Sequence, residues 1–411
     1  VSSGAGPAGM PIPVSDDPRA QTRPALAVST APVPHGAVAV WQDARAGTNT
    51  GIYGQRLQPD GTTSGLHFGL TPLPRLQTVP VLAYSGESDH YLSVWANVFG
   101  GGGNQSTEVM AYLLNGDGAL ASAPITLTDH ILTTTTEVAV DWAYGEDAFL
   151  ATWSDNGTIV GQRVSGAGNL TGDNFVVSAS ASHQEAPVVV AGFNQYLVLF
   201  ESTGPISQTT DIFGQLLALD GQRVGDAFNI SRLSVAMQQA REPHAAYDAI
   251  NNTFLVVWQE QDPTSPGIAL WNIAGQMVAG EGGGLLGPRR MLAAVLEIQE
   301  NHPHIAWIGP EDAPFYLLVW TSFNMNTGQS DIMARRLDQD GTLLNSAHPL
   351  VATQVEQESR PVVSYDPFSR RFLVVWDRTV QGMSFASAIQ AQQLDARGRP
   401  EGPMLSLADN D

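Results

Sequence analysis

The stretch from Ala37 to Gly61, AVAVWQDARAGTNTGIYGQRLQPDG, decides the fold because its pattern returns six more times along the chain. The apolar run that ends at Trp41 recurs in runs that end at Trp95, Trp153, Phe200, Trp258, Trp320 and Trp376. A second motif of the shape IYGQRL follows each run, starting at Ile52, Val109, Ile159, Ile212, Ile268, Ile332 and Ile389. A repeat of about 56 residues predicts one closed array of units rather than several separate domains.

Each repeat contains four segments with the length of β-strands. Six repeats open with a short apolar segment after a proline, at Pro24, Pro80, Pro187, Pro243, Pro303 and Pro361, and the third opens with VAVDWAY from Val138. The run that ends in tryptophan is apolar on both faces, which indicates a strand in a sheet packed between other sheets. The IYGQRL motif is the third strand, and a turn such as Pro59-Asp60-Gly61 leads to a fourth.

Seven units of four antiparallel strands without helical periodicity predict an all-β fold, a seven-bladed β-propeller. We expect residues 1–9 to be a linker and 10–411 to be one propeller domain. The blades are predicted at about 17–72, 73–129, 130–180, 181–233, 234–293, 294–353 and 354–411, with 10–16 as a closing strand in the last blade. The third strands carry glycine or alanine at one position, Leu270 being the exception, so we expect a neighbouring sheet to approach closely there.

The combination of motifs in the first repeat resembles a known family. VWQDAR ends at Arg45, IYGQRL spans Ile52 to Leu57, and Asp60-Gly61 follows. This combination is similar to a repeat found in many bacterial secreted and surface proteins. The resemblance covers nearly the whole chain and implies a β-propeller fold and a secreted or cell-surface location. It says little about activity, because the members of that family are mostly uncharacterised.

The composition narrows the classes of partner. The net charge is −21, from 40 acidic residues against 19 basic ones, and all 19 are arginine. Such a surface repels nucleic acid and anionic membranes, so a glycan or protein is the expected partner. Cysteine is absent, which excludes disulfides and thiolate chemistry. No apolar run is long enough to cross a membrane, and the first residues resemble a linker left after removal of a leader. We expect a monomeric fold, with assembly into a larger surface structure left open.

Ionisable residues gather around the opening proline of each repeat, where the first strands of a propeller converge on the central channel. A ligand-binding site at this channel mouth is predicted from Arg23, Glu137, Arg241, Glu242, His244, Glu300, His302, His304, Glu358 and Arg360, with Glu185 beside them. Converging ionisable groups are typical of functional sites. The alternative interpretation is an arginine–glutamate network that neutralises itself and closes the channel.

Two functions fit these patterns. The first is a non-catalytic binding or assembly module that presents its loop face to a glycan, protein or matrix partner. The second is a polysaccharide-active enzyme, a lyase or glycosidase, with a glutamate pair as acid and base or with His or Arg neutralising a uronate. His244 and His304 take the same position in adjacent repeats. If an anionic group binds beside them, we expect its binding to strengthen as the pH falls through about 6.5.

Motifs for known catalytic centres and cofactors are absent from the sequence. It contains no nucleophile elbow, HExxH or phosphate loop, so we assign no catalytic residues and expect no cofactor. Calcium is the one candidate metal, with Asp43, Asp155, Glu260 and Asp377 as carboxylates that could contribute. The sequence around Asp155 matches the Asp-box of sialidases only in part, and Asp338 to Gly341 predicts a turn rather than a calcium loop.

Overall fold

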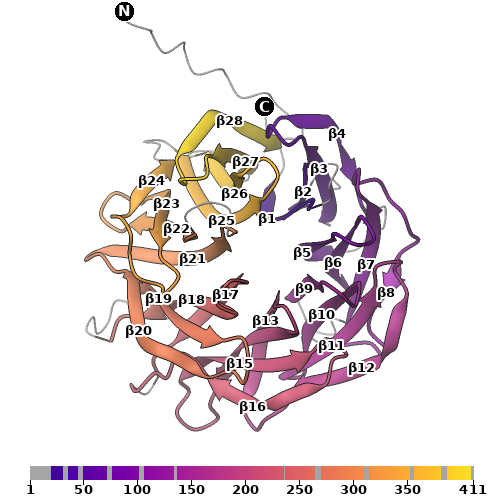
Figure 1. The fold of residues 1–411 in the computed structure, drawn as a ribbon, viewed down its shortest axis with the longest axis horizontal. Helices are drawn as coiled ribbons and strands as arrows, with labels where there is room; N and C mark the ends of the chain where they lie inside the picture. The colour runs from indigo at the N-terminus through magenta and orange to yellow at the C-terminus, as the bar shows by residue number, and fades with distance from the viewer. Residues whose placement is uncertain are drawn as a thin grey trace, which may run out of the picture.

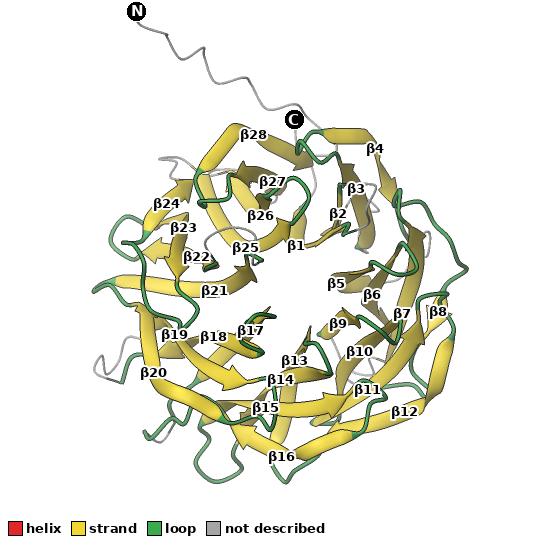
Figure 2. Ribbon diagram, in the orientation of Figure 1, coloured by secondary structure: helices red, strands yellow, loops and turns green. Residues whose placement is uncertain are grey.

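Seven four-stranded antiparallel sheets are arranged in a ring around a central axis in the computed structural model (Figure 1). The structure describes residues 20–30, 36–44, 50–71, 76–100, 106–133, 137–235, 237–263, 270–309, 314–351, 356–380 and 387–408. Every regular element in these ranges is a strand (Figure 2). The seven-bladed β-propeller predicted from the repeat is confirmed. Within the described ranges, no helix exists that could span a membrane.

The first four blades are formed by β1 to β16. Blade 1 contains β1 (Gln21–Val28), β2 (Ala37–Asp43), β3 (Gly51–Leu57) and β4 (Thr63–Gly69). Blade 2 contains β5 (Leu76–Ser85), β6 (His90–Phe99), β7 (Ser106–Asn115) and β8 (Ile125–Thr126). Blade 3 contains β9 (Val138–Ala143), β10 (Ala148–Asp155), β11 (Thr158–Ser165) and β12 (Leu170–Ser178). Blade 4 contains β13 (His183–Ala191), β14 (Gln195–Thr203), β15 (Thr210–Ala218) and β16 (Arg223–Asn229).

The remaining three blades are formed by β17 to β28. Blade 5 contains β17 (Ala240–Asp248), β18 (Thr253–Gln261), β19 (Trp271–Ala279) and β20 (Leu285–Ala293). Blade 6 contains β21 (Ile298–Trp307), β22 (Tyr316–Asn324), β23 (Gln329–Leu337) and β24 (His348–Val351). Blade 7 contains β25 (Glu356–Asp366), β26 (Arg371–Val380), β27 (Ser387–Leu394) and β28 (Pro400–Ala408). In every blade the first strand lies nearest the channel and the fourth at the rim.

The aromatic residue at the end of each second strand is buried between blades, as its doubly apolar strand predicts. The exposed fraction of the side chain is 0 or 1% for Trp41, Trp95, Trp153, Phe200, Trp258, Trp320 and Trp376. The apolar clusters run from one blade into the next, so each blade completes the core of its neighbour. Trp41 of blade 1 thus packs in one cluster with Val375 of blade 7, which closes the ring by apolar contact.

The glycine–glutamine pair of the third strand fixes the fourth strand of its own blade. In blade 1 the side-chain Nε2 of Gln55 donates to the carbonyl oxygens of Arg56 and Gly65 at 2.9 and 3.3 Å. The same pattern recurs at Gln162, Gln215, Gln276 and Gln392. A Cβ on Gly54 would lie 2.9 Å from Phe68 of β4. The prediction that a neighbouring sheet approaches this position is therefore wrong, because the close contact lies within the blade.

Blade 5 departs from the predicted alignment of its third strand. The strand begins at Trp271, and Gly275 pairs with Val257 as Gly54 pairs with Val40 in blade 1. The motif is thus Ile273 to Val278, and Leu270 precedes the strand, while Ile268 lies outside the described residues. The longer connection after β18 explains the error, since it displaces the motif by five residues from the predicted position.

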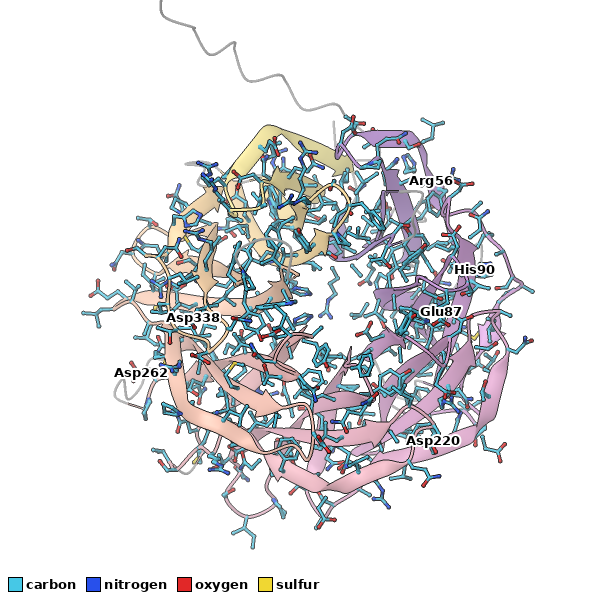
Figure 3. All side chains as sticks on the ribbon, in the orientation of Figure 1. Arg56, Glu87, His90, Asp220, Asp262 and Asp338 are labelled. Carbon is cyan, nitrogen blue, oxygen red and sulfur yellow. The ribbon has the colours of Figure 1, made fainter. Side chains whose placement is uncertain are left out.

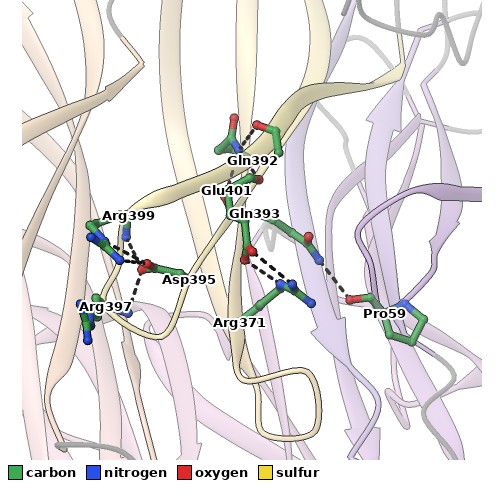
Figure 4. Close-up of polar contacts among 9 residues, drawn as sticks. Pro59, Arg371, Gln392, Gln393, Asp395, Arg397, Arg399 and Glu401 are labelled. Carbon is green, nitrogen blue, oxygen red and sulfur yellow. Dashed lines mark hydrogen bonds and ion pairs between the residues drawn. The ribbon is translucent and has the colours of Figure 1, made fainter. Parts of the chain in front are cut away.

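Polar contacts between blade 7 and blade 1 complete the ring closure. The amide of Gln21 donates to the Oγ of Ser387 at 2.8 Å, and that hydroxyl donates back to the Gln21 carbonyl at 2.7 Å. Near the rim, Gln393 donates to the carbonyl of Pro59 at 3.1 Å (Figure 4). In the described residues, β28 is the outer strand of blade 7. The linker 1–9 and the predicted closing strand 10–16 lie outside those residues.

Candidate functional site

A cavity of about 630 Å³ occupies the channel, and residues from the first strands of all seven blades line it. The side chains in Figure 3 surround the axis of the ring rather than fill it. The start of each first strand pairs with the end of the second strand, so this end of the channel lies beside the connections that follow the second strands. Concave sites of this size with a few polar groups are typical places for ligand binding.

A β-bulge shapes the start of six of the seven first strands. The residue before the opening proline has a left-handed backbone in each of them: Arg23, Val79, Ala186, Glu242, His302 and Arg360, with φ between 42° and 56°. The register shifts at the same place, and bulges re-aim side chains at such sites. Blade 3 has Glu137 there without a proline or a register shift. We call these seven residues the mouth ring, and all seven line the cavity.

The left-handed residues are held by side chains from the preceding blade. In four junctions the residue that follows the buried aromatic accepts the amide N–H of the mouth-ring residue. The acceptors are Asp377 for Arg23 at 3.0 Å, Glu201 for Glu242 at 2.8 Å, Gln259 for His302 at 2.9 Å and Thr321 for Arg360 at 3.0 Å. A non-glycine residue in this region costs of order 1–3 kcal/mol and persists only when its surroundings hold it. These bonds therefore fix the geometry of the mouth.

Glu242 is kept ionised by its neighbours in the mouth ring. Burial opposes its ionisation, but the hydrogen bond with Nδ1 of His302 and the positive charges of His302, Arg360 and Arg23 outweigh that effect. The pKa of Glu242 is therefore lowered below its usual value. A carboxylate of low pKa in a cavity is suited to act as a base or a nucleophile.

Glu137 has the opposite environment. Its carboxyl group opens into the cavity and has no hydrogen bond or ion pair with the described residues. The surrounding walls and the negative charges of Glu185 and Glu242 raise its pKa, and the charges of Arg23 and Arg241 offset this only in part. Ala186 of blade 4 stands between Glu137 and Glu242 in the order of the mouth ring. The site thus pairs an acid of raised pKa with one of lowered pKa.

Three of the predicted ligand-binding residues lie outside the cavity lining and support it from behind. Arg241 pairs with Glu201 at 2.7 Å and with Glu185 at 3.3 Å. Glu300 accepts the indole N–H of Trp320 at 2.6 Å. The side chain of Glu358 is fully buried. Burial also raises the pKa of Glu201 to about 7, although the hydrogen bond from the Glu242 N–H and the positive charge of Arg241 act to lower it.

His244 and His304 lie side by side in adjacent blades, as their shared repeat position indicates. Their ring centroids are 3.5 Å apart, and Nδ1 of His304 accepts the amide of Val363 at 3.3 Å. Burial lowers the pKa of His244 to about 4 and the pKa of His304 well below its usual value, with the charge of His244 adding to the second effect. These shifts argue against the prediction that this pair gains protons near pH 6.5, because burial favours the neutral form of both rings.

Two acidic residues of the site were not predicted as ligand-binding residues. Asp141 of β9 lines the cavity and accepts the amide of Ala191 at 2.8 Å, and burial raises its pKa to about 6. Asp377 accepts the amide of Arg23, and burial raises its pKa to about 7. The sequence feature that could have identified Asp141 is its acidic side chain inside VAVDWAY, at a place where the other first strands are apolar. The signal for Asp377 is weaker, since residues of several types follow the buried aromatic.

The carboxylates considered for calcium are engaged in other contacts. Asp43 accepts the indole N–H of Trp41 at 3.1 Å, and Glu260 pairs with Arg289 at 2.7 Å. Asp155 contacts His130 at 3.1 Å at the start of a two-residue turn. In the ranges that the structure describes, no group of three or more His, Asp or Glu residues is arranged to hold a metal ion. Calcium binding stays a prediction.

No protein-family model matches the chain, and no curated protein matches it. Solved structures of similar fold include a protein of unknown function from Dyadobacter fermentans, with 12% identity over 93% of this chain and 96% of that chain and a TM-score of 0.56. An alpha-L-arabinanase of Penicillium chrysogenum complexed with arabinobiose is 10% identical over 95% of this chain and 99% of that chain, with a TM-score of 0.55. An alpha-L-arabinofuranosidase of Fusarium graminearum, in complex with an iminosugar inhibitor, is 8% identical over 95% of this chain and 99% of that chain, with a TM-score of 0.54.

These comparisons correct the first functional hypothesis. A non-catalytic binding or assembly module is contradicted as the leading interpretation, because the similar structures include an arabinanase and an arabinofuranosidase. At identities of 8 to 12% the similarity itself establishes the fold alone. The activity has to be argued from the residues of the mouth ring.

Proposed function

We propose that the protein is a glycoside hydrolase whose catalytic site is the mouth ring. The observation that carries this proposal is the pair Glu137 and Glu242, which line one cavity and have pKa values moved in opposite directions. Glycosidases use two carboxyl groups in this way, one protonated and one ionised, on either side of the bond that is cleaved. The arabinose-active enzymes of similar fold support the same assignment.

Glu137 acts as the general acid. It has no partner among the described residues, so its proton is available to the oxygen of the glycosidic bond as that bond breaks. Glu242 remains ionised and takes the proton of the attacking water, or attacks the anomeric carbon first and is released by water afterwards. The ring of His302 is hydrogen-bonded to the side chain of Glu242, and the carboxylate of Glu201 accepts the backbone amide N–H of Glu242. The anomeric configuration of the product distinguishes the two routes for Glu242.

The partner is therefore a glycan, and we place the protein outside the cell. The arabinanase was solved with arabinobiose, which supports a carbohydrate as the ligand of this chain. The repeat resembles that of bacterial secreted and surface proteins, and a polymeric glycan is a substrate that an enzyme meets outside the cell. Secretion of the protein into the medium, followed with an antibody against the propeller, tests the location.

The activity is tested by incubating the protein with arabinan, other plant and bacterial polysaccharides, and sialosides, with reducing ends as the readout. We expect hydrolysis of at least one, and a loss of about 10²-fold or more in kcat for Glu137→Gln and Glu242→Gln, since each removes a proton-transfer group. Glu146→Gln is the control, because Glu146 pairs with Arg163 at the opposite end of the first strands. Full activity in both test variants, or unsaturated products of elimination, would overturn the proposal.

A further inference from the structure

Charge is distributed unevenly around the mouth ring. Arg360 of blade 7 and Arg23 of blade 1 are neighbours, whereas Glu137 and Glu242 lie in blades 3 and 5. The whole chain carries a net charge of −21, so two arginines together at the cavity are a local exception. A cavity wall with one sign of charge attracts ligands of the other sign. The side of the mouth formed by blades 7 and 1 is therefore suited to an anion.

Among the described residues, Asp377 is a carboxyl group near both arginines, and burial opposes its ionisation. In the described ranges the guanidinium group of Arg23 makes no hydrogen bond or ion pair. Arg360 has one ion pair, with Asp377 at 3.8 Å, which is longer than a hydrogen bond. Their charges influence Glu242, yet Glu242 pairs directly with His302 instead. Arg23 and Arg360 thus stand outside the ion pairs that Arg241 forms with Glu201 and Glu185.

The two arginines are also held in place by their backbones. Arg23 and Arg360 have φ values of 56° and 51°, and each amide donates to a side chain of the preceding blade at 3.0 Å. Both side chains line the cavity and are partly buried. A guanidinium group presents parallel N–H donors that match a carboxylate in a bidentate arrangement, and a pre-organised group loses less freedom when it binds.

We propose that Arg23 and Arg360 bind the carboxylate of an acidic sugar residue in the glycan substrate. This inference rests on the proposed function, because it places the acidic sugar in the same cavity as Glu137 and Glu242. The chemistry recognised is a planar carboxylate attached to a sugar ring, as in a uronic acid or a sialic acid. Neutral arabinose polymers lack this group, so the substrate class differs from that of the arabinanase of similar fold.

The test is calorimetric titration of the full chain with glucuronate, N-acetylneuraminate and glucose at low ionic strength. We expect binding of one or both acidic sugars and much weaker binding of glucose, and the stronger acidic sugar identifies the source of the carboxylate. Arg23→Asn and Arg360→Gln should weaken that binding about tenfold or more, which corresponds to about 1.4 kcal/mol. Asn tolerates the left-handed backbone of Arg23, so the first variant removes the charge with little strain.

Two further variants complete the design. Arg397→Asn removes an exposed arginine from an outer turn of blade 7 and should leave the affinity unchanged. Arg23→Lys keeps the charge without the planar fork, so an intermediate loss is expected. Melting temperatures of all variants identify any that are unfolded, and in that case Arg23→Lys and Arg360→Gln carry the test.

The outcomes separate this inference from the proposed function. Equal binding of glucose and the acidic sugars, or unchanged affinity in Arg23→Asn and Arg360→Gln, would refute the acidic-sugar site. Hydrolysis of neutral arabinan with unaltered kinetics in Arg23→Asn would keep the hydrolase and refute the site as well. Binding of an acidic sugar that depends on the arginines, in a protein that hydrolyses no glycan, would keep the site and overturn the hydrolase.

Discussion

Asp377 provides the sharpest test of the electrostatics of the mouth, because its carboxyl group is buried where blade 7 meets blade 1. The side chain is 2% exposed, and its Oδ1 accepts the amide of Arg23 at 3.0 Å. Burial raises its pKa from 3.8 to about 7, although Arg360 and Arg23 favour the ionised form. The folded state therefore keeps a proton that the unfolded state has already lost, and stability falls as the pH rises from about 4 to about 7.

The variant Asp377→Asn keeps an oxygen for the Arg23 amide and cannot ionise. Each pH unit between the two pKa values corresponds to about 1.4 kcal/mol, so the full effect on the free energy of unfolding is about 4 kcal/mol. We expect the advantage of the variant over the parent protein to grow by about 2 kcal/mol between pH 5.5 and 7 and to stay constant above about 7.5. The assay is urea unfolding at pH 5.5, 6.5, 7.5 and 8.5, away from the sequence pI of about 4.6, where association is promoted.

Asp395→Asn is the matched control for this experiment. Burial opposes ionisation of Asp395, but hydrogen bonds from Arg399 and Arg397 outweigh it and lower its pKa (Figure 4). A group of lowered pKa contributes stability above its unfolded pKa and loses it only as the pH falls below the usual carboxyl range. The difference between this variant and the parent should therefore be constant from pH 5.5 to 8.5. A stability difference for Asp377→Asn that is also constant would show that the two arginines keep Asp377 ionised, and the reasoning would fail.

Three other predictions follow from the packing, the glutamine contacts and the histidines. Trp258→Ala should lower the free energy of unfolding by about 3–5 kcal/mol, because the side chain is fully buried between blades 5 and 4, and urea unfolding measures it. Gln276→Ala should lower the free energy of unfolding by about 1–3 kcal/mol in the same assay, since the carbonyls of Met277 and Leu286 lose their hydrogen-bond donor. Gln222 is exposed, so the control Gln222→Ala should change the free energy of unfolding by less than about 0.5 kcal/mol. The rings of His244 and His304 should not titrate by NMR between pH 8 and 5, whereas the pKa of His130 is raised, chiefly by its hydrogen bond with Asp129, so it should titrate above about 6.5. Because the unfolded state binds protons at His244 below about pH 6.5 and the folded state does not, this residue should cost stability as the pH falls from 6.5 towards 4.

The repeat predicted the architecture because one packing contact recurs in every blade. The aromatic residue at the end of each second strand is buried between sheets. Each blade needs this residue, so an aromatic residue recurs at a regular spacing in the sequence. The glutamine of the third strand also recurs in the sequence, although its partners on the fourth strand could not be inferred from the sequence. The alignment failed where the spacing changed, at Leu270, because a longer connection moved the next motif away from its expected place.

The sequence predicted part of the lining of the channel cavity. The residues around the opening proline lie at this cavity, and seven of the ten residues predicted for the site line it. Arg241, Glu300 and Glu358 do not, because alternate residues of a strand point to opposite faces and the bulge resets that alternation at each mouth-ring residue. The roles of Asp377 and Glu201 depend on contacts between blades, which no local pattern in the sequence records.

The structure of the mouth explains how a repeat protein can build a site from unlike residues. In the junctions that involve Arg23, Glu242, His302 and Arg360, a side chain of the preceding blade holds the backbone amide of the mouth-ring residue. The bulge then directs the side chain of the mouth-ring residue to the cavity whatever its type. The fold therefore sets seven positions around the axis without setting their chemistry, and Arg, Val, Glu, Ala, Glu, His and Arg fill them in order of the blades. Since the architecture requires none of these side chains, we attribute their arrangement of two separated glutamates opposite two adjacent arginines to the glycan substrate that we propose.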